Sequence, residues 1–389
     1  MTTNKQLFGQ YFTTNNELKE IVYKFILNKP NEILEPSIGQ GDLVKLILDK
    51  HTNITIDMYE IDPTIKLLSN IDKNQVKYTD FLVQNINKKY LTIVGNPPYV
   101  RSKKGNLYID FIDKCVDLLV DNGELIFIIP SDLFKLTSAS KLLNKMILLG
   151  SFTHIYHPNN DKLFKDATID IIVFRYCKDS LLPKICNYNN ENMYINNSDG
   201  LITFTKNINN STKTFSDLFD IYVGLVSGKD EVYKNELLGN ISVLTGENKI
   251  EKFIYTEKYP TNNLEINNYL LQNKSDLLNR QIRKFNDNNW FEWGAPRNIH
   301  TISDNLGKEC IYIYNLTRKD KIAFKSTVQY FGGSLLILIP KQNIDLSKVI
   351  EYLNSNNFKN NFMFSGRFKI GHRQLSNSYI PDDKIIIIQ

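Results

Sequence analysis

Asn96-Pro97-Pro98-Tyr99 is the stretch of this sequence whose residue types could do chemistry. The apolar run over residues 91–94 predicts a short buried strand that ends in this tetrapeptide. Two successive prolines lack a main-chain N–H and fix φ, so neither a helix nor a sheet can continue through them. We therefore expect a stiff loop at the carboxyl edge of the strand, where open α/β sheets bind their ligands.

The polar groups of this loop are suited to binding a flat base that carries an exocyclic amino group. The amide oxygen of Asn96 and the main-chain carbonyl of Pro97 can accept both amino protons, and the ring of Tyr99 can lie against the base. These hydrogen bonds draw electron density toward the amino protons, which frees the nitrogen lone pair from conjugation with the ring. The amino nitrogen thereby becomes a better nucleophile.

A glycine-rich turn between an expected strand and an expected helix over residues 43–50 is the second candidate site. Its sequence is Glu35-Pro36-Ser37-Ile38-Gly39-Gln40-Gly41. Gly39 and Gly41 would let the backbone approach a ligand closely at the helix N-terminus. The spacing differs from G-x-G-x-x-G, and an acidic residue before the turn suits a cationic or hydroxyl-bearing ligand better than a pyrophosphate.

Two further carboxylates stand at the ends of expected strands. Glu60 ends the strand over residues 54–60, about twenty residues past the glycines, where a carboxylate can take both hydroxyls of a ribose. Asp80 ends the strand over residues 76–81, where it could accept the amino proton of an adenine while Phe81 packs on the ring. The alternatives are a solvated carboxylate at Glu60, and a turn aspartate followed by a core aromatic at Asp80 and Phe81.

Three carboxylates at consecutive strand ends, followed by Asn-Pro-Pro-Tyr, form a much more specific pattern than any one of them. In this order the sequence resembles the TaqI-type (γ-class) N6-adenine DNA methyltransferases, which depend on S-adenosylmethionine. The resemblance is strong up to residue 176 and looser beyond it. It implies an α/β fold, with a Rossmann-like seven-stranded methyltransferase sheet followed by a C-terminal mixed α+β target-recognition domain.

The domain organisation follows from this resemblance. We expect an S-adenosylmethionine-binding catalytic domain over residues 1–185, a linker or irregular hairpin over 186–212, and a DNA target-recognition domain over 213–389. Helical periodicity and apolar runs predict the remaining elements. In the first domain these are helices over 16–27, 106–119 and 134–149 and strands over 124–130, 152–157 and 169–175, and in the second a strand over 335–340 and a helix over 349–357.

The resemblance also assigns roles to single residues. Asn96, Pro97 and Tyr99 would be catalytic, and Tyr99 and Phe164 would stack on the two faces of a target adenine rotated out of the duplex. Phe164 could instead be a core aromatic before a strand. The cofactor would contact Tyr11, Thr13, Glu35, Pro36, Ser37, Gly39, Gly41, Glu60, Ile61, Asp80, Phe81 and Asn96.

Basic residues near aromatic residues are the candidate DNA contacts, because Arg and Lys bind phosphates and guanine edges. Any single one of them could be a solvated surface charge, and residues 101–105 could be a disordered tip. The candidates are Arg101 and Lys103 beside the active site, and Arg283, Arg297, Arg318, Lys319, Arg367, Lys369 and Arg373 in the second domain.

Composition limits the class of protein. A chain of 389 residues exceeds one ordinary core, and its net charge of +5 permits a polyanionic partner without requiring one. The sequence shows neither a long apolar span nor a secretory signal, and its four cysteines are far apart. The resemblance implies a monomer with double-stranded DNA as its partner. We expect no metal and no membrane contact, and a location in the bacterial cytoplasm or in the host cell of a virus. A cognate restriction endonuclease could act separately.

Other chemistries fit the sequence less well. None of the cysteines follows a proline, which excludes the thiolate mechanism of cytosine-C5 methyltransferases. N4-cytosine enzymes usually carry Ser in place of Asn96, and glutamine methyltransferases carry their extra domain before the catalytic fold. A ribosomal-RNA adenine or guanine methyltransferase, a protein-glutamine methyltransferase and a non-catalytic DNA-binding module on the same scaffold remain alternatives. Pro381-Asp-Asp-Lys384 lacks the separated Asp and Glu-x-Lys of a nuclease site and is better interpreted as a charged turn.

Overall fold

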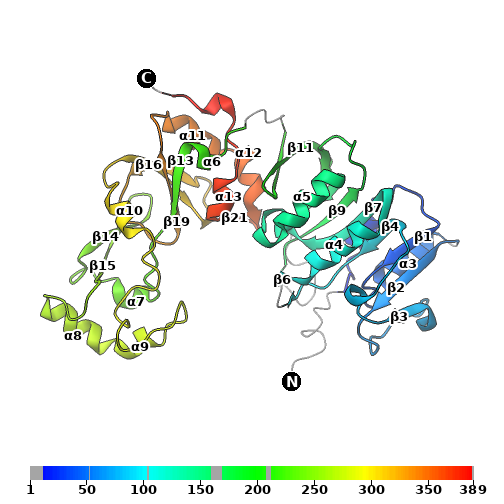
Figure 1. Ribbon diagram of the computed structural model, residues 1–389, viewed down its shortest axis with the longest axis horizontal. Helices are drawn as coiled ribbons and strands as arrows, with labels where there is room; N and C mark the ends of the chain where they lie inside the picture. Colours follow the sequence, from blue (N-terminus) through cyan, green and yellow to red (C-terminus); the bar gives the residue numbers. More distant parts are fainter. Residues whose placement is uncertain (1–11, 52, 103–104, 159–168, 207–211, 388–389) are drawn as a thin grey trace. The chain divides into compact units, whose positions relative to one another are not determined.

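The computed structural model describes residues 12–51, 53–102, 105–158, 169–206 and 212–387. The chain divides into two compact units (Figure 1). Unit 1 comprises Met1–Asn209 and Phe364–Gly366, and unit 2 comprises Asn210–Met363 and Arg367–Gln389. In the described part of the chain, no helix is long and apolar enough to cross a membrane, and no three His, Cys, Asp or Glu side chains lie so as to hold a metal ion.

A ten-stranded sheet forms the centre of the described part of unit 1. The core strands β3, β2, β1, β4 and β7 run parallel to one another, whereas β9 is antiparallel to both of its neighbours β7 and β8. The strand order across the sheet is β12 (Leu201–Thr205), β11 (Glu191–Ser198), β10 (Ile185–Tyr188), β8 (Ser151–Tyr156), β9 (Ile171–Cys177), β7 (Leu119–Pro130), β4 (Tyr90–Gly95), β1 (Glu32–Glu35), β2 (Thr55–Glu60) and β3 (Val76–Tyr78).

Helices cover both faces of this sheet, as strand alternation requires. Along β7, Leu125, Phe127 and Ile129 pack in the same cluster as α4 (Leu107–Leu118) and α5 (Ser140–Leu149). Ile126 and Ile128, which alternate with them, pack against α2 (Asn16–Lys24) and α3 (Asp42–Lys50). Both faces are therefore buried, and the carboxyl ends of the parallel strands all point to one edge.

The expected Rossmann-like methyltransferase sheet is confirmed. Over 186–212 we expected a linker or an irregular hairpin, and the described residues there form hairpin-connected strands of the same sheet instead of a linker. Residues of β10, β11 and β12 extend the sheet, and Cys186, Ile195 and Phe204 join its core. Two two-residue hairpin loops connect these strands, at Asn189-Asn190 and Asp199-Gly200, and all four residues have positive φ. Such loops favour Asn, Asp and Gly. The asparagine-rich stretch that resembled a linker therefore supplies turns and half-exposed strand faces, and the boundary between the units falls after Asn209.

The helix predicted over 134–149 is shorter than expected. Residues Ser131–Lys135 (η3) and Thr137–Ala139 (η4) form 3-10 turns, and α5 begins only at Ser140. Two further 3-10 turns precede it in the chain, η1 (Lys73–Gln75) and η2 (Phe81–Val83), and β5 (Arg101–Ser102) pairs with β6 (Gly105–Asn106).

Unit 2 contains a four-stranded antiparallel sheet in the order β13 (Phe219–Val223), β19 (Leu335–Pro340), β16 (Glu309–Tyr314) and β18 (Ala323–Thr327). The expected strand over 335–340 is present, and the helix expected over 349–357 is α11 (Leu346–Asn354) followed by α12 (Asn356–Lys359). A small sheet joins β17 (Leu316–Thr317), β21 (Arg367–Lys369) and β20 (Met363–Phe364), and β14 (Ile241–Gly246) pairs with β15 (Lys249–Phe253). The other elements are α6 (Phe215–Leu218), α7 (Asp230–Tyr233), α8 (Leu264–Gln272), α9 (Lys274–Leu278), α10 (Ile299–Ser303), α13 (His372–Ser376), η5 (Asn360–Phe362) and η6 (Asp382–Lys384).

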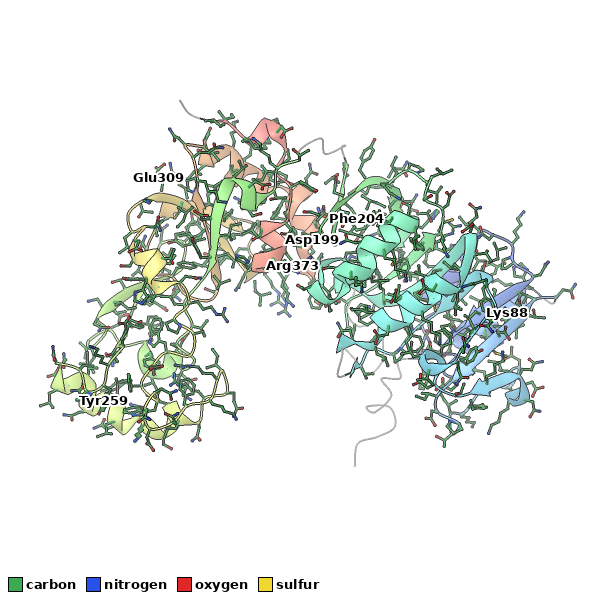
Figure 2. The ribbon with its side chains drawn as sticks, in the orientation of Figure 1. Lys88, Asp199, Phe204, Tyr259, Glu309 and Arg373 are labelled. Carbon is green, nitrogen blue, oxygen red and sulfur yellow. The ribbon has the colours of Figure 1, made fainter. Side chains whose placement is uncertain are left out.

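An aromatic cluster forms a second core in unit 2. Tyr259, labelled in Figure 2, packs on Trp290 at 4.8 Å and on Phe291 at 5.7 Å between ring centroids. Trp293 is buried, and its indole N–H donates to the carbonyl of Ile254 at 2.9 Å. The tryptophans therefore stabilise the fold of this unit.

Candidate functional site

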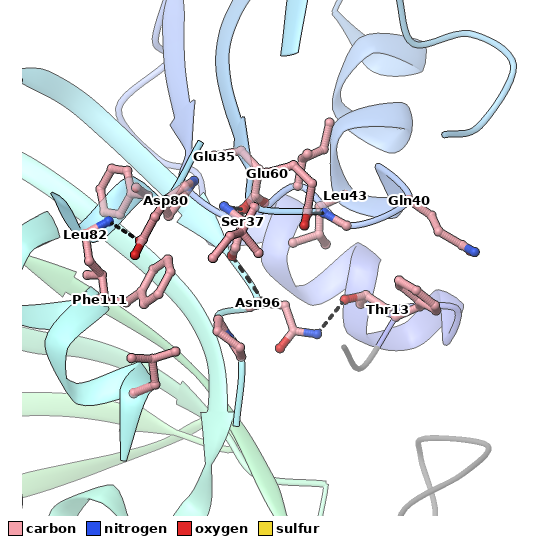
Figure 3. Close-up of a pocket in the computed structure, with 18 of the residues that line it drawn as sticks. Thr13, Glu35, Ser37, Gln40, Leu43, Glu60, Asp80, Leu82, Asn96 and Phe111 are labelled. Carbon is pink, nitrogen blue, oxygen red and sulfur yellow. Dashed lines mark hydrogen bonds between the residues drawn. The ribbon is translucent and has the colours of Figure 1, made fainter. Parts of the chain in front are cut away.

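The carboxyl ends of β1, β2, β3 and β4 surround a cavity of about 160 Å³ in unit 1 (Figure 3). A buried water needs roughly 10–15 Å³ by the same measure, so the cavity admits an organic ligand. Its wall consists of Phe12, Thr13, Glu35, Pro36, Ser37, Ile38, Gly39, Gln40, Asp42, Leu43, Glu60, Ile61, Thr79, Asp80, Phe81, Leu82, Asn96, Pro98, Val100, Leu107 and Phe111.

The glycine turn forms one side of the cavity. The N–H of Gly39 donates to Oε2 of Glu60 at 2.9 Å, so the turn is tied to the end of the neighbouring strand. Gly39 and Gly41 have φ of +58° and +91°, which L side chains rarely adopt. A Cβ on Gly41 would lie 1.8 Å from Cδ1 of Ile71. Gly41 precedes α3 and does not line the cavity, so its contribution is to the shape of the turn.

Four carboxylates line the cavity, and none of its described lining residues is Lys or Arg. Glu35 is buried and accepts a hydrogen bond from the N–H of Ser37 at 3.0 Å, and burial raises its pKa to about 8. Burial also raises the pKa of Glu60 and of Asp42 above their ordinary values. A cation in this cavity would stabilise the ionised carboxylates, so the wall favours a positively charged ligand.

The Asp80 turn forms the opposite side. Oδ1 of Asp80 accepts the N–H of Leu82 at 2.9 Å, which starts the 3-10 turn η2. Phe81 is buried, and its ring stacks on Phe111 with centroids 5.5 Å apart and planes 24° apart. Asp80 is therefore a turn aspartate and Phe81 is a core aromatic residue, which is the alternative that the sequence left open. Both residues also line the cavity.

Asn96 enters the cavity wall from the end of β4 (Figure 3). Its Nδ2 donates to Oγ1 of Thr13 at 3.0 Å, and its Oδ1 accepts from the hydroxyl of Tyr99. The Tyr99 hydroxyl also lies 3.0 Å from the carbonyl oxygen of Ile128, and its ring packs edge-on to Tyr108. Pro97 and Tyr99 do not line the cavity, whereas Pro98 does.

The structure brings together ten of the twelve residues expected to contact a cofactor. Gly41 stands behind the wall, and Tyr11 lies outside the described residues, as do Phe164 and Lys103. Of Arg101, the description covers only the main chain. The proposed stacking partner of Tyr99 and the two basic residues of the nearby loop therefore stay predictions.

Sequence reasoning missed several lining residues, including Phe12, Asp42 and the pair Leu107 and Phe111 on α4. Leu107 and Phe111 are four positions apart, so they lie on one helix face. Their spacing identified an amphipathic helix, but it could not indicate that this face borders a cavity as well as the core.

In unit 2 some candidate DNA contacts lie on paired strands, whereas Arg283 forms an ion pair within the unit. Because Thr317 pairs with Phe368 in antiparallel β17 and β21, Arg318 and Lys319 follow directly beside Arg367, and Lys369 lies opposite Leu316. We call Arg318, Lys319, Arg367 and Lys369 the basic strand pair. Lys319 also lies 4.8 Å over the ring of Tyr314.

The other candidate cations of unit 2 differ in their surroundings. Arg283 pairs with Glu292 at 2.6 Å and also donates to the carbonyl of Trp293. Its neighbour Arg280 is buried and donates to the carbonyls of Ser227, Leu277, Trp290 and Glu292, so it is structural. Arg297 is exposed, and Arg373, labelled in Figure 2, lies on α13.

Comparisons with known proteins agree with this geometry. Residues 7–164 match the family model described as Eco57I restriction-modification methylase. The Type II methyltransferase M.HincII of Haemophilus influenzae is 33% identical over 207 residues, which are 47% of this chain and 40% of that protein. The alignment thus spans about two fifths of that relative's length. The ribosomal RNA small subunit methyltransferase A of Aster yellows witches'-broom phytoplasma is 34% identical over 110 residues, 25% of this chain and 40% of that protein.

The fold extends the likeness beyond the matched residues. The Type IIL restriction-modification enzyme MmeI, solved in complex with DNA, superposes with a TM-score of 0.58 over 94% of this chain and 64% of that chain, at 12% identity. At that identity the likeness establishes the fold alone. Over residues 7–164, the chain is therefore similar to the restriction-modification methylases.

Proposed function

We propose that the protein is an S-adenosylmethionine-dependent DNA methyltransferase of a restriction-modification system, which methylates the N6 amino group of adenine in double-stranded DNA. The observation that carries the proposal is the meeting of two features in one cavity. A wall of four carboxylates favours a cationic ligand, and the amide of Asn96 from the Asn-Pro-Pro-Tyr loop stands on the same wall. The γ-class assignment rests on that loop and on the order of the carboxylates along the chain.

The residues present fit S-adenosylmethionine. When bound, this cofactor supplies a methyl group on a positively charged sulfur. Asp80 and Phe81 would hold its adenine, and the carboxylate of Glu60 would accept the ribose hydroxyls. Glu35 and Asp42 provide negative charge for the sulfonium and amino ends. Positive φ at Gly39 lets the main chain approach the ligand without a Cβ between them.

Asn96 and the carbonyl of Pro97 would orient the target amino group. The adenine would rotate out of the duplex, at a cost of a few kcal/mol for unstacking. Tyr99 would pack on one face of the base, and Phe164 on the other by family resemblance. Transfer would be direct, without a covalent enzyme intermediate, because orientation and hydrogen bonding of the amino group supply the catalysis.

Unit 2 would contact the DNA duplex through the basic strand pair. Its four cations come from two segments about fifty residues apart in the chain, and the pairing of β17 with β21 brings these segments together. Arg and Lys side chains of this kind bind phosphates and position a protein on DNA. We further propose that the protein acts as a cytoplasmic monomer.

Methylation of ribosomal RNA is the second candidate function, and the match of 110 residues to the phytoplasma ribosomal RNA methyltransferase supports it. The two substrates are distinguished by their recognition surface. A reader of duplex DNA needs the second unit, so loss of the basic strand pair should impair DNA methylation and leave transfer to a small RNA unaffected. A non-catalytic DNA-binding module would bind DNA without any transfer to either.

The deciding experiment offers plasmid DNA and ribosomal RNA in parallel, with S-adenosylmethionine labelled on its methyl group. We expect label in the DNA, at N6 of adenines in one sequence context, located by single-molecule sequencing. Asn96→Ala should abolish transfer and leave cofactor binding within about threefold of wild type, because Asn96 would orient the target amino group, whereas its contact with the cofactor would be one among the many that the cavity wall supplies. Unchanged turnover in Asn96→Ala would contradict the mechanism, and label in RNA alone would contradict the substrate.

A further inference from the structure

Lys114 on α4 holds the turn that follows Asp80. Its ammonium group donates to three main-chain carbonyls, those of Phe81 at 2.5 Å, Leu82 at 3.1 Å and Gln84 at 2.5 Å. An ammonium group has three N–H donors, so its whole hydrogen-bonding capacity is directed at one turn. The same nitrogen lies 4.7 Å from the centroid of the Phe81 ring.

The turn that Lys114 holds is a wall of the cavity. Asp80, Phe81 and Leu82 all line it, and Asp80 is the residue directly before the three carbonyl-bearing positions. Phe111, which stacks on Phe81, stands three positions before Lys114 on the same helix. One face of α4 therefore offers a ring to the aromatic side chain of the turn and a cation to its main chain.

The side chain of Gln84 fastens the far end of the turn. Its Nε2 donates to Oγ1 of Thr79 at 2.8 Å, which joins the last residue of the turn to the one before Asp80. The loop is thus closed on itself by Gln84 and fixed to α4 by Lys114. Loss of the ammonium would leave three partly buried carbonyls without this donor, and the main chain would relax to find others.

We propose that Lys114 is a positioning residue of the purine subsite. It holds the Asp80 carboxylate where that group accepts a hydrogen bond from the 6-amino group of the cofactor and disfavours a purine with a 6-oxo group. The identity of the ligand rests on the proposed function. Lys114 does not line the cavity, yet it sets the selectivity of the site through the turn that does.

Lys184 provides a matched control in the same unit. Its ammonium also donates to a main-chain carbonyl, that of Gly150 at 2.6 Å, and burial lowers its pKa as it lowers that of Lys114. Lys184 is absent from the cavity wall. Lys184→Met should therefore reproduce the loss of a partly buried lysine–carbonyl contact without a change in the purine subsite.

The test measures calorimetric affinities for S-adenosylhomocysteine and for S-inosylhomocysteine, which differ in the 6-amino and 6-oxo groups. A hydrogen bond to a charged acceptor is worth about 1.5–3 kcal/mol, so wild type should prefer the adenine form roughly tenfold or more. Lys114→Met should reduce that preference to less than about threefold, and Lys114→Arg, which keeps the charge, should restore part of it. Lys184→Met should keep the wild-type preference. Thermal unfolding of each variant measures the structural cost separately.

The possible outcomes test the proposed function and the role of Lys114 separately. Failure of wild type to bind S-adenosylhomocysteine would contradict the proposed function itself. Binding by wild type, with the adenine preference unchanged in Lys114→Met, would overturn the role of Lys114 and leave the proposed function intact. An equal loss of affinity for both ligands would also overturn it, because that result describes a lysine that only stabilises the fold. If Lys114→Met does not fold, Lys114→Gln is measured by the same two affinities.

Discussion

Glu35 should make cofactor binding depend on pH, and the structure gives the size of the effect. Its carboxyl is buried, accepts a hydrogen bond from the N–H of Ser37, and has a pKa raised to about 8 by burial. At pH 7 about one tenth of the empty protein would carry an ionised Glu35. A cationic ligand favours the ionised form, so binding should release a proton from this residue.

The affinity for S-adenosylmethionine should therefore rise with pH by up to tenfold per unit below pH 8 and level off above it. Glu35→Gln removes the proton and the charge together. That variant should bind more weakly at pH 8 and above, and it should lack the part of the pH dependence that Glu35 supplies. Glu60 and Asp42 remain in the variant, so the difference between the two curves isolates Glu35.

Isothermal titration calorimetry between pH 6 and pH 9, in pairs of buffers with different ionisation enthalpies, counts the protons released. Wild type should release close to one proton more than Glu35→Gln near neutral pH. S-Adenosylhomocysteine, whose sulfur is neutral, should give a smaller difference. Equal proton release by wild type and variant would refute the reasoning, because it would mean that Glu35 keeps its proton beside the ligand.

Three further predictions follow from other parts of the structure. Gly41→Ala should lower the free energy of unfolding by more than about 2 kcal/mol, because both the positive φ of this residue and the nearby Ile71 side chain oppose a Cβ. Gly39→Ala, where only the positive φ opposes a Cβ, should lower it by about 1 kcal/mol, and urea denaturation measures both values. In the empty protein the raised pKa of Glu35 means that the folded state binds its proton more tightly than the unfolded state, so stability should fall as pH rises from 4.5 to about 8, and should do so less in Glu35→Gln. Replacement of both Arg318 and Arg367 by Ala should reduce the slope of log affinity for DNA against log salt concentration by about 2, one for each lost phosphate contact. Arg283→Ala should change this slope little, because the Arg283 side chain is paired with Glu292. An unchanged slope in the double variant would argue against DNA binding by the basic strand pair.

The site residues that sequence could predict share one property: each stands at the end of its own strand. Parallel strands bring their carboxyl ends to one edge, so Glu35, Glu60, Asp80 and Asn96 had to meet once the strands were identified. Phe111 and Lys114 were not predictable in this way, because their roles depend on which side of α4 packs beside the Asp80 turn.

The errors have a similar physical origin. The Asn189-Asn190 and Asp199-Gly200 turns carried a recognisable hairpin signal, but the half-exposed strand β11 between them lacks a strong apolar alternation. In unit 2 no local pattern distinguishes Arg283, which is neutralised by Glu292, from Arg318, which the β17–β21 pairing sets beside Arg367. Such distinctions arise from tertiary contacts between distant segments.

The hydroxyl of Tyr99 faces two oxygens with a single hydrogen. When that hydrogen turns toward Ile128, the amide oxygen of Asn96 keeps its electron pairs for an incoming donor. When it turns toward Asn96, part of that electron density is already committed. Rotation about one C–O bond thus adjusts how strongly the asparagine attracts the next proton it meets.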